Sequence, residues 1–383
     1  MSEPRYDVAV VGGSLAGSAA AAALARGGAS VIVLEKARFP RPKICGGFLS
    51  PEAEPVLARM GALEEIRAAG PETVTRFALV KPDGRRVEAD LPAPVLSLSR
   101  ERLDALVAAA AERQGARIRF GEAAGFVEGN LRDGFGVRTG DEALRARVLV
   151  GAWGRFSPLD GRLTRPHLRQ TAALIGFGKQ LVGDGSRLAG RAVLHLFPGG
   201  YLGLSLVEGG AVNLAALATP DVAREAHQDL DELLARLKTG SAALAADLEG
   251  LAPSPGPVLV SEPVRLGPHG AVAGDVLLAG DAAGVIDPYT GTGMALALLS
   301  GEAAAGPILR FLAGRLDAGA LKREHADGHR ALVGRRFAYS RLFRSVFYGG
   351  ALSRLVGPAA APLARLAVRL TRGRSTRRPS TGS

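Results

Sequence analysis

The sequence predicts an α/β protein, in which a parallel-sheet domain is interleaved with an antiparallel-sheet domain and followed by C-terminal helices. Three observations support this class. At the start of the chain, an apolar strand, a glycine turn, a small-residue helix and a second strand follow one another. A strand-rich block without long helices occupies 171–218, which is typical of an antiparallel sheet. A further apolar strand at 276–279 leads through a Pro/Gly loop into a helix-forming segment at 293–312.

The N-terminal unit has the length of a β-α-β motif. Tyr6–Val11 is a continuous apolar strand, and Leu15–Arg26 is a strong helix former whose alanines and glycine permit close packing on a sheet. Two glycines end this helix before the second strand, Ser30–Glu35.

The remaining elements follow from local patterns. Thr73–Asp90 predicts a hairpin that turns at Pro82-Asp83-Gly84. We expect helices at 51–60 and 99–114 and helical structure over 221–248, and strands at 117–120, 148–150, 171–180, 191–197, 201–207 and 211–218.

The turn of the first unit carries Gly12-Gly13-Ser14-Leu15-Ala16-Gly17, and the second strand ends at Glu35 and Lys36. Glycine lets the strand reverse into the helix, and the helix N-terminus offers free N–H groups and a positive dipole end to a pyrophosphate. Glu35 is placed to accept hydrogen bonds from an adenosine ribose. Ser14 replaces the usual second glycine, which crowds the phosphate slightly but adds a hydroxyl donor. The unit predicts a Rossmann-like nucleotide-cofactor site.

A second motif narrows the cofactor. The strand at 276–279 ends in Gly280-Asp281, and Pro288, Gly291, Thr292, Gly293 and Met294 lead into the next helix. This resembles the second FAD signature of the para-hydroxybenzoate hydroxylase-like flavoprotein superfamily. The resemblance implies a glutathione reductase-type FAD domain in which Asp281 binds the ribityl chain. Residues 291–294 would then lie near the pyrimidine end of the flavin, where a helix N-terminus favours the negative charge of the reduced ring.

Two further segments resemble the same superfamily. Arg100 opens an R-x-x-L-D helix start, and the resemblance implies that this arginine contacts the cofactor. Gly151-Ala152-Trp153-Gly154 lies where the family has Gly-Ala-Asp-Gly. In hydroxylases of the family that aspartate supports FAD and nicotinamide binding, so Trp153 leaves the electron donor open between NAD(P)H and another reductant.

The loop from Arg41 to Pro51 contains Lys43-Ile44-Cys45-Gly46-Gly47. It resembles the K-x-C-G-G loop of geranylgeranyl reductase-like flavoproteins, which runs beside the isoalloxazine. Lys43 and Arg41 either approach the FAD phosphates or are solvated. Cys45 is either a proton donor or redox thiol, or a small residue packed against the flavin. There is no second cysteine with which it could form a redox pair.

No catalytic residue is assigned from the sequence. Cys45, Tyr201 and Tyr289 are the candidates, and His195 and Asn213 are further candidates for the substrate face. The sequence shows no metal-ligand cluster and no Ser/His/Asp arrangement. A halogenase is disfavoured because Trp153 is the sole tryptophan and a W-x-W-x-I-P element is absent.

The predicted domains are discontinuous. Segments 1–75, 96–168 and 258–330 form the FAD-binding domain, and segments 76–95 and 169–257 form the substrate-binding sheet domain. Residues 331–383 form a basic helical C-terminal segment with a disordered end.

Charge is concentrated at the C-terminal end. The net charge is +11, but residues 328–383 hold twelve arginines and no acidic residue, so the other 327 residues carry a net −1. The body therefore does not predict a nucleic-acid binder. Apolar side chains from Phe337 to Val356 alternate with arginines, which favours either an interfacial membrane helix or a helical cap over the substrate cleft. We expect a cytoplasmic protein, either free or in peripheral contact with the membrane, since no signal peptide pattern is visible.

The resemblance implies an FAD-dependent oxidoreductase. The leading hypothesis is reduction, or the reverse desaturation, of carbon–carbon double bonds in a lipophilic isoprenoid- or polyketide-like substrate, by hydride transfer at flavin N5. The alternative is a monooxygenase that hydroxylates an aromatic or polyketide substrate through a C4a-hydroperoxyflavin. A flavin-binding protein without turnover is a minor alternative.

Overall fold

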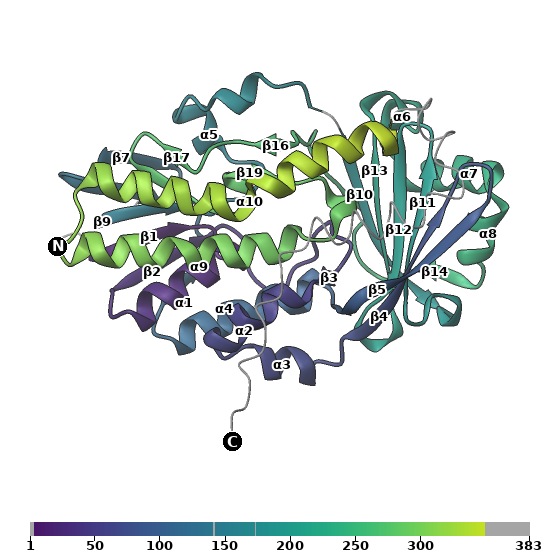
Figure 1. Ribbon diagram of the computed structural model, residues 1–383, viewed down its shortest axis with the longest axis horizontal. Helices are drawn as coiled ribbons and strands as arrows, with labels where there is room; N and C mark the ends of the chain where they lie inside the picture. Colours follow the sequence, from purple (N-terminus) through teal and green to yellow (C-terminus); the bar gives the residue numbers. More distant parts are fainter. Residues whose placement is uncertain (1–3, 141, 173, 349–383) are drawn as a thin grey trace.

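The computed structural model describes residues 4–140, 142–172 and 174–348, and two large sheets stand side by side in it (Figure 1). Sheet A consists of β1 (Arg5–Val11), β2 (Val31–Glu35), β6 (Arg117–Phe120), β7 (Phe126–Asn130), β8 (Gly134–Thr139), β9 (Glu142–Gly151), β17 (Val272–Ala273) and β18 (Val276–Leu278). Its order is β17-β18-β9-β1-β2-β6, with β8 and β7 continuing from β9. The pairs β1–β2, β1–β9, β2–β6 and β9–β18 are parallel, and the predicted α/β class is confirmed.

Three helices form a layer against sheet A. These are α1 (Leu15–Arg26), α4 (Arg100–Arg113) and α9 (Gly293–Leu312), and both α4 and α9 lie against α1. Helix α1 is buried on nearly all sides, which its alanines permit, because small side chains allow neighbouring backbones to approach closely. In the described part of the chain, α9 is the helix that is long and apolar enough to cross a membrane. It lies between α1 and α10 (Ala318–Tyr348), and this packing accounts for its composition (Figure 1).

Sheet B is mostly antiparallel and consists of β3 (Phe48–Leu49), β4 (Glu72–Val80), β5 (Arg86–Ser97), β10 (Ile175–Gly183), β11 (Arg191–Phe197), β12 (Gly200–Leu206), β13 (Val212–Ala218), β14 (Leu251–Pro253) and β15 (Leu259–Val260). Its order is β14-β10-β13-β12-β11-β4-β5-β3, with β15 beside β10. The hairpin predicted at Thr73–Asp90 is confirmed as β4–β5. Two short strands, β3 and β15, pair into sheet B, although the segments that contain them were predicted for the FAD-binding domain.

The two faces of sheet B have different neighbours, as the period-2 alternation of strands requires. One face packs against α6 (Pro220–Glu225), α7 (Leu230–Gly240) and α8 (Ala242–Asp247). The opposite face carries a separate cluster that includes Tyr289, from the Pro/Gly loop before α9. The cluster consists of Leu79, Leu174, Leu194, Tyr201 and Leu217, with Phe77, Leu196, Leu266 and Tyr289 packed against it.

The helical stretch expected over 221–248 is confirmed, and it consists of three short helices. His227 and Gln228 adopt positive φ values of 48° and 55°, which ends α6 and turns the chain. Asp229 and Ser241 then cap α7 and α8 by accepting backbone N–H groups. The capping residues were visible in the sequence, but the apolar periodicity continues across the breaks.

The remaining elements connect the two sheets. A 3₁₀ turn (Pro51–Ala53), α2 (Glu54–Met60) and α3 (Leu63–Ala68) follow β3, α5 (Pro158–Arg162) follows β9, and β16 (Gly267–Pro268) pairs with β19 (Gly284–Val285). Helix α10 runs without interruption across position 330/331, where the predicted C-terminal segment begins. The chain from 349 onward, where most of the predicted C-terminal segment falls, lies outside the described residues.

We expect Gly301→Ala in α9 to destabilise the protein. A Cβ at Gly301 would lie 2.9 Å from the Ala16 carbonyl carbon and closer still to its oxygen, so α1 and α9 would have to separate. Overpacking of this kind costs about 1–3 kcal/mol, measurable as a lower midpoint in urea unfolding.

Gly306→Ala is the matched control in the same helix. Gly306 is exposed, and a Cβ there would meet only Arg310, at 3.9 Å. That substitution should leave stability unchanged or raise it by up to ~1 kcal/mol, through helix propensity alone. Equal effects of the two substitutions would contradict the packing argument.

Candidate functional site

The N-terminus of α1 lies in a close-packed cradle of neighbouring backbone that leaves no space for a Cβ at Gly12 or Gly17. Gly12 has φ 102°, and a Cβ there would lie 2.7 Å from the Ala152 carbonyl carbon. A Cβ at Gly17 would lie 2.9 Å from the carbonyl carbon of Gly12. Ser14 occupies the N-cap position without a side-chain cap bond, because its hydroxyl turns toward α4. The first N–H groups of α1 therefore receive no bond from this side chain, which is the arrangement of an anion site.

Glu35 lies beside this cradle at the end of β2. It is buried, and its two carboxylate oxygens accept the N–H groups of Gly13 at 2.8 Å and Ala37 at 2.9 Å. A carboxylate offers about four lone-pair sites, so Glu35 retains acceptor capacity for ribose hydroxyls. Lys36, the next residue, is exposed.

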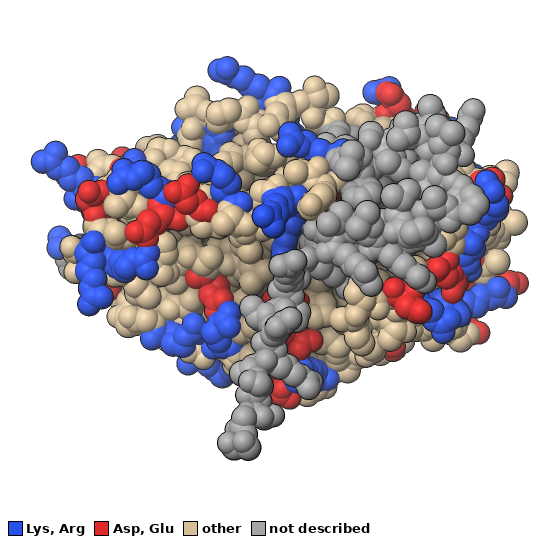
Figure 2. Space-filling model, in the orientation of Figure 1, with Lys and Arg blue, Asp and Glu red and all other residues tan. Residues whose placement is uncertain are grey.

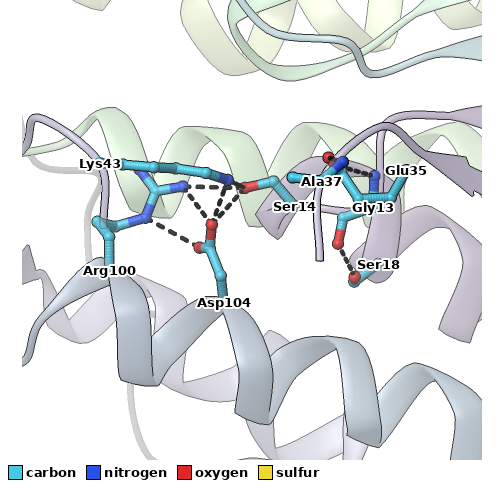
Figure 3. A network of polar contacts seen from close by, with 8 residues as sticks. All are labelled: Gly13, Ser14, Ser18, Glu35, Ala37, Lys43, Arg100 and Asp104. Atoms are coloured by element: carbon cyan, nitrogen blue, oxygen red, sulfur yellow. Dashed lines mark hydrogen bonds and ion pairs between the residues drawn. The ribbon is translucent and has the colours of Figure 1, made fainter. Parts of the chain in front are cut away.

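A four-residue polar cluster joins α1, the K-x-C-G-G loop and α4 (Figure 3). The Arg100 guanidinium donates to Asp104 Oδ1 at 2.9 Å and to the Ser14 hydroxyl at 2.9 Å. The Lys43 ammonium donates to the same hydroxyl at 2.9 Å and forms an ion pair with Asp104. The structure thus brings together three predicted residues, and it adds Asp104, for which the only sequence signal was the last position of R-x-x-L-D.

The charges in this cluster do not balance. Burial disfavours ionisation of Asp104, but Arg100 and Lys43 outweigh it and hold the pKa of Asp104 below its ordinary value. Burial lowers the pKa of Lys43 to about 8, against the raising effect of Asp104. Arg41 lowers the pKa of Lys43 further, and its own Nε is buried without a hydrogen-bond partner among the described residues. Two cations therefore pair with one carboxylate beside a helix N-terminus, and Arg41 adds a third positive charge close to Lys43, which fits a bound dianion such as a pyrophosphate.

The Gly-Asp motif follows β18. Gly280 has φ 62°, and its N–H donates to the Ser300 hydroxyl in α9 at 2.9 Å. The Asp281 side chain is 39% exposed, and its carboxylate lies 3.6 Å from the Arg155 guanidinium. Asp281 is therefore accessible to a ligand.

The Pro/Gly loop before α9 is held by contacts with α10, and the sequence did not predict these contacts. The Asp287 N–H donates to the Ser340 hydroxyl at 3.3 Å, and the Tyr289 hydroxyl donates to the Ser340 carbonyl at 2.7 Å. The phenol proton of Tyr289 is thus directed at α10, which argues against Tyr289 as a proton donor. Pro288 is exposed, and Gly291 adopts φ 64° at the turn that precedes Thr292, Gly293 and Met294.

The K-x-C-G-G loop lies directly on sheet B. Cβ atoms at Gly176 and Gly178 in β10 would meet Ile44 at 3.5 and 3.1 Å, so glycine gives the loop room. The Asn213 amide donates to the Cys45 carbonyl at 2.5 Å, and the Ser205 hydroxyl donates to the Gly46 carbonyl at 3.2 Å. Asn213, expected on the substrate face, thus anchors this loop.

The remaining candidates, Cys45, Tyr201 and His195, lie in different surroundings. Cys45 is half-buried and contacts the Arg100 guanidinium. Tyr201 lies in the apolar cluster on the face of sheet B that Tyr289 contacts. His195 is buried and its Nε2 lies 3.0 Å from Asp247 in α8. Its expected place on the substrate face is therefore wrong, because its register turns it to the helix-covered face.

A buried polar cluster around Arg165 holds the backbone of the Gly-Asp segment in place. The Arg165 guanidinium donates to the carbonyls of Ala282 at 2.8 Å and His269 at 2.7 Å, and pairs with Asp160 at 3.0 Å. The Trp153 indole donates to Asp160 at 3.2 Å. Trp153, which replaces the family aspartate, is thus a structural part of this cluster. No group of three or more potential metal ligands occurs among the described residues.

Known proteins share both the sequence pattern and the fold. A family model described as FAD binding domain matches residues 5–176. Menaquinone reductase of Mycobacterium tuberculosis is 31% identical over 325 residues, covering 78% of this chain and 75% of that protein. Digeranylgeranylglycerophospholipid reductase 1 of Methanothermobacter thermautotrophicus is 28% identical over 335 residues, with coverages of 79% and 77%. The flavin-dependent brominase Bmp2 superposes with TM-score 0.78 at 19% identity, covering 96% of this chain and 93% of that one, which shows the fold alone.

The fold, the cradle and these relatives define an FAD-dependent oxidoreductase. The chain belongs to the para-hydroxybenzoate hydroxylase-like superfamily of flavoproteins, in its geranylgeranyl reductase-like branch. The resemblance on which the cofactor was predicted is confirmed.

The pKa of Lys43 predicts that FAD binding weakens in mild alkali. The side chain loses its proton as pH rises through about 8, so the site loses one positive charge above that pH. We expect the dissociation constant of FAD from deflavinated protein to rise between pH 7 and 9.5, approaching tenfold per pH unit once Lys43 is neutral. Fluorescence titration at constant ionic strength measures it.

Lys43→Arg is the control, because arginine stays charged throughout this range. Its affinity should be nearly independent of pH. A wild-type affinity that is also flat between pH 7 and 9.5 would show that the Lys43 charge does not contribute to binding.

Proposed function

We propose that this flavoenzyme reduces carbon–carbon double bonds, or catalyses the reverse desaturation, in a lipophilic isoprenoid- or polyketide-like substrate. The observation that carries the proposal is the apolar face that sheet B turns toward the loop before α9. Leu194, Leu217 and Tyr201 on this face pack with Tyr289 from that loop. Two relatives named as reductases, for menaquinone and for digeranylgeranylglycerophospholipid, support the reductive direction.

The described residues fit FAD along one path. The adenosine ribose would meet Glu35, and the pyrophosphate would meet the N-terminus of α1 with Lys43, Arg41 and Arg100. The ribityl chain would meet Asp281. The N-terminus of α9, at Gly293, would then face the flavin ring, where its dipole favours the reduced form. When bound, FAD supplies hydride transfer at flavin N5.

The protein's own residues orient the substrate and exclude water. The apolar face of sheet B favours an uncharged substrate, because burying a charge there would require a partner. The K-x-C-G-G loop is fixed through the Cys45 and Gly46 carbonyls and by Ile44, so its position relative to that face is rigid. Such a fixed geometry brings the reacting carbon to the ring without a charged catalytic group.

We propose a lipophilic small molecule as the partner, and a cytoplasmic location, either free or in peripheral contact with the membrane through the basic C-terminal segment. Figure 2 shows basic and acidic side chains interspersed on the described part of one face. Together with the net −1 of the first 327 residues, this supports the proposal that nucleic acid is not a partner. NAD(P)H or another reductant would supply the electrons.

Asp281→Ala tests the cofactor path. Loss of a charge-assisted hydrogen bond to the ribityl chain should weaken FAD binding about 10–100-fold, from ~1.5–3 kcal/mol. Asp275→Ala is the control, since the Asp275 carboxylate accepts the Leu131 N–H at 3.0 Å and pairs with Lys322 at 2.6 Å. The control should lower thermal stability but leave FAD affinity unchanged. An unchanged affinity in Asp281→Ala would remove this aspartate from the path.

The reaction itself is tested by single turnover without oxygen. Photoreduced enzyme is mixed anaerobically with a polyprenyl alkene or a menaquinone, and flavin absorbance and product mass are followed. We expect flavin reoxidation with one acceptor, and a product with two added hydrogens on the carbons of a former isoprenoid double bond. Reduction of a quinone to its quinol adds the same mass but leaves these double bonds intact. An enzyme that oxidises its flavin only with O2, and yields a product containing one new oxygen atom, would instead be a monooxygenase.

A further inference from the structure

Glu208 lies in the turn that joins β12 to β13, where sheet B meets the start of α4. Its carboxylate accepts the Ser99 N–H at 2.8 Å through Oε2 and the Ser99 hydroxyl through Oε1. Gly209 and Gly210, with φ values of 71° and 74°, let the chain reverse tightly behind it. One carboxylate from sheet B thus takes up both donors of a single serine.

Ser99 is the N-cap of α4 and is almost fully buried. Its hydroxyl oxygen accepts the Arg102 N–H at 3.1 Å, and its carbonyl accepts the Leu103 N–H at 2.9 Å. A cap hydroxyl that accepts a hydrogen bond from the helix can still donate one of its own, and the Glu208 carboxylate accepts it. The carboxylate also places negative charge at the positive end of the helix dipole. The start of α4 is thereby fixed to sheet B.

The first residue of α4 is Arg100, whose guanidinium reaches Ser14 at the N-terminus of α1 and Asp104 one turn further along α4. The orientation of the first turn of α4 therefore sets where the guanidinium lies beside the anion site. The same junction holds the K-x-C-G-G loop, since the Leu98 N–H donates to the Gly47 carbonyl at 3.1 Å and Gly47 lies against Val207.

We propose that Glu208 is a positioning residue for FAD: through Ser99 it holds Arg100 in the orientation that binds the cofactor, and so couples the substrate sheet to the cofactor site. The inference rests on the proposed contact between Arg100 and FAD. It does not depend on which reaction the flavin performs.

The test is a double-mutant cycle on FAD affinity. The dissociation constant is measured by fluorescence titration of the deflavinated full chain for wild type, Glu208→Ala, Arg100→Ala and the double variant. We expect each single variant to weaken FAD binding about tenfold or more, and the double variant to be no weaker than Arg100→Ala alone, because coupled residues are not additive. Independent, multiplying effects of the two substitutions would overturn the proposal.

Asp229→Ala is the matched control for a purely structural cap. Asp229 caps α7 on the other face of sheet B by accepting the Glu232 N–H at 3.0 Å. Its loss should lower the melting temperature, as Glu208→Ala does, without changing FAD affinity. An FAD dissociation constant of Glu208→Ala no higher than that of Asp229→Ala would reduce Glu208 to an ordinary cap and overturn the proposal.

Glu208→Gln keeps one carbonyl oxygen for Ser99 and should fold in case Glu208→Ala does not. We expect it to weaken FAD binding by a smaller factor than Glu208→Ala, and to lose that effect when Arg100 is also replaced. If Arg100→Ala alone leaves FAD affinity unchanged, the assumed cofactor contact fails. If Arg100→Ala does weaken FAD binding, but Glu208→Gln weakens it by the same factor whether or not Arg100 is present, the proposed coupling between Glu208 and Arg100 is wrong.

Discussion

The close approach of α1 to its neighbours constrains every other part of the cofactor site. Gly12 and Gly17 leave no room for a Cβ between β1, the strand end at Ala152 and the first turn of the helix. Gly301 in α9 and Gly280 in the Gly-Asp segment meet Ala16 in the same helix. Because these contacts leave no space for side chains, both cofactor motifs, although far apart in sequence, lie around one helix N-terminus.

Asp104 organises the charges at that terminus. A buried carboxylate with two cationic partners is costly to isolate but favourable when paired, and here it aligns Lys43 and Arg100 without neutralising both. The remaining positive charge, with that of Arg41, is available to an anion. Ser14, an apparent departure from the dinucleotide fingerprint, becomes the point where both cations meet (Figure 3). The substitution therefore replaces a glycine contact by a network that includes α4.

Sheet B contributes more than a surface for the substrate. Asn213 and Ser205 hold the K-x-C-G-G loop, and Glu208 from the same sheet holds the start of α4. Ser340 in α10 holds Tyr289 in the loop before α9. Each of these contacts ties the proposed substrate region to the proposed cofactor region, so substitutions in one are expected to affect the other.

Local patterns in the chain were sufficient to predict most elements and a nucleotide-cofactor site, and the resemblance to a flavoprotein family identified the cofactor as FAD. Apolar periodicity and glycine turns were enough for the first β-α-β unit, the β4–β5 hairpin and α9, because such patterns depend on neighbours a few residues away. Only the tertiary structure showed which side chains contact one another. The contacts of Asp104 with Lys43, Glu208 with Ser99 and Ser340 with Tyr289 join residues that lie roughly fifty to more than a hundred positions apart in the sequence. The same holds for His195, which faces Asp247 rather than the substrate side, since a shift of one residue in strand register reverses the face of a side chain. Strand register and long-range pairing are set by how the elements pack against one another. Local patterns in a single sequence do not show this packing, so they could not be predicted from it.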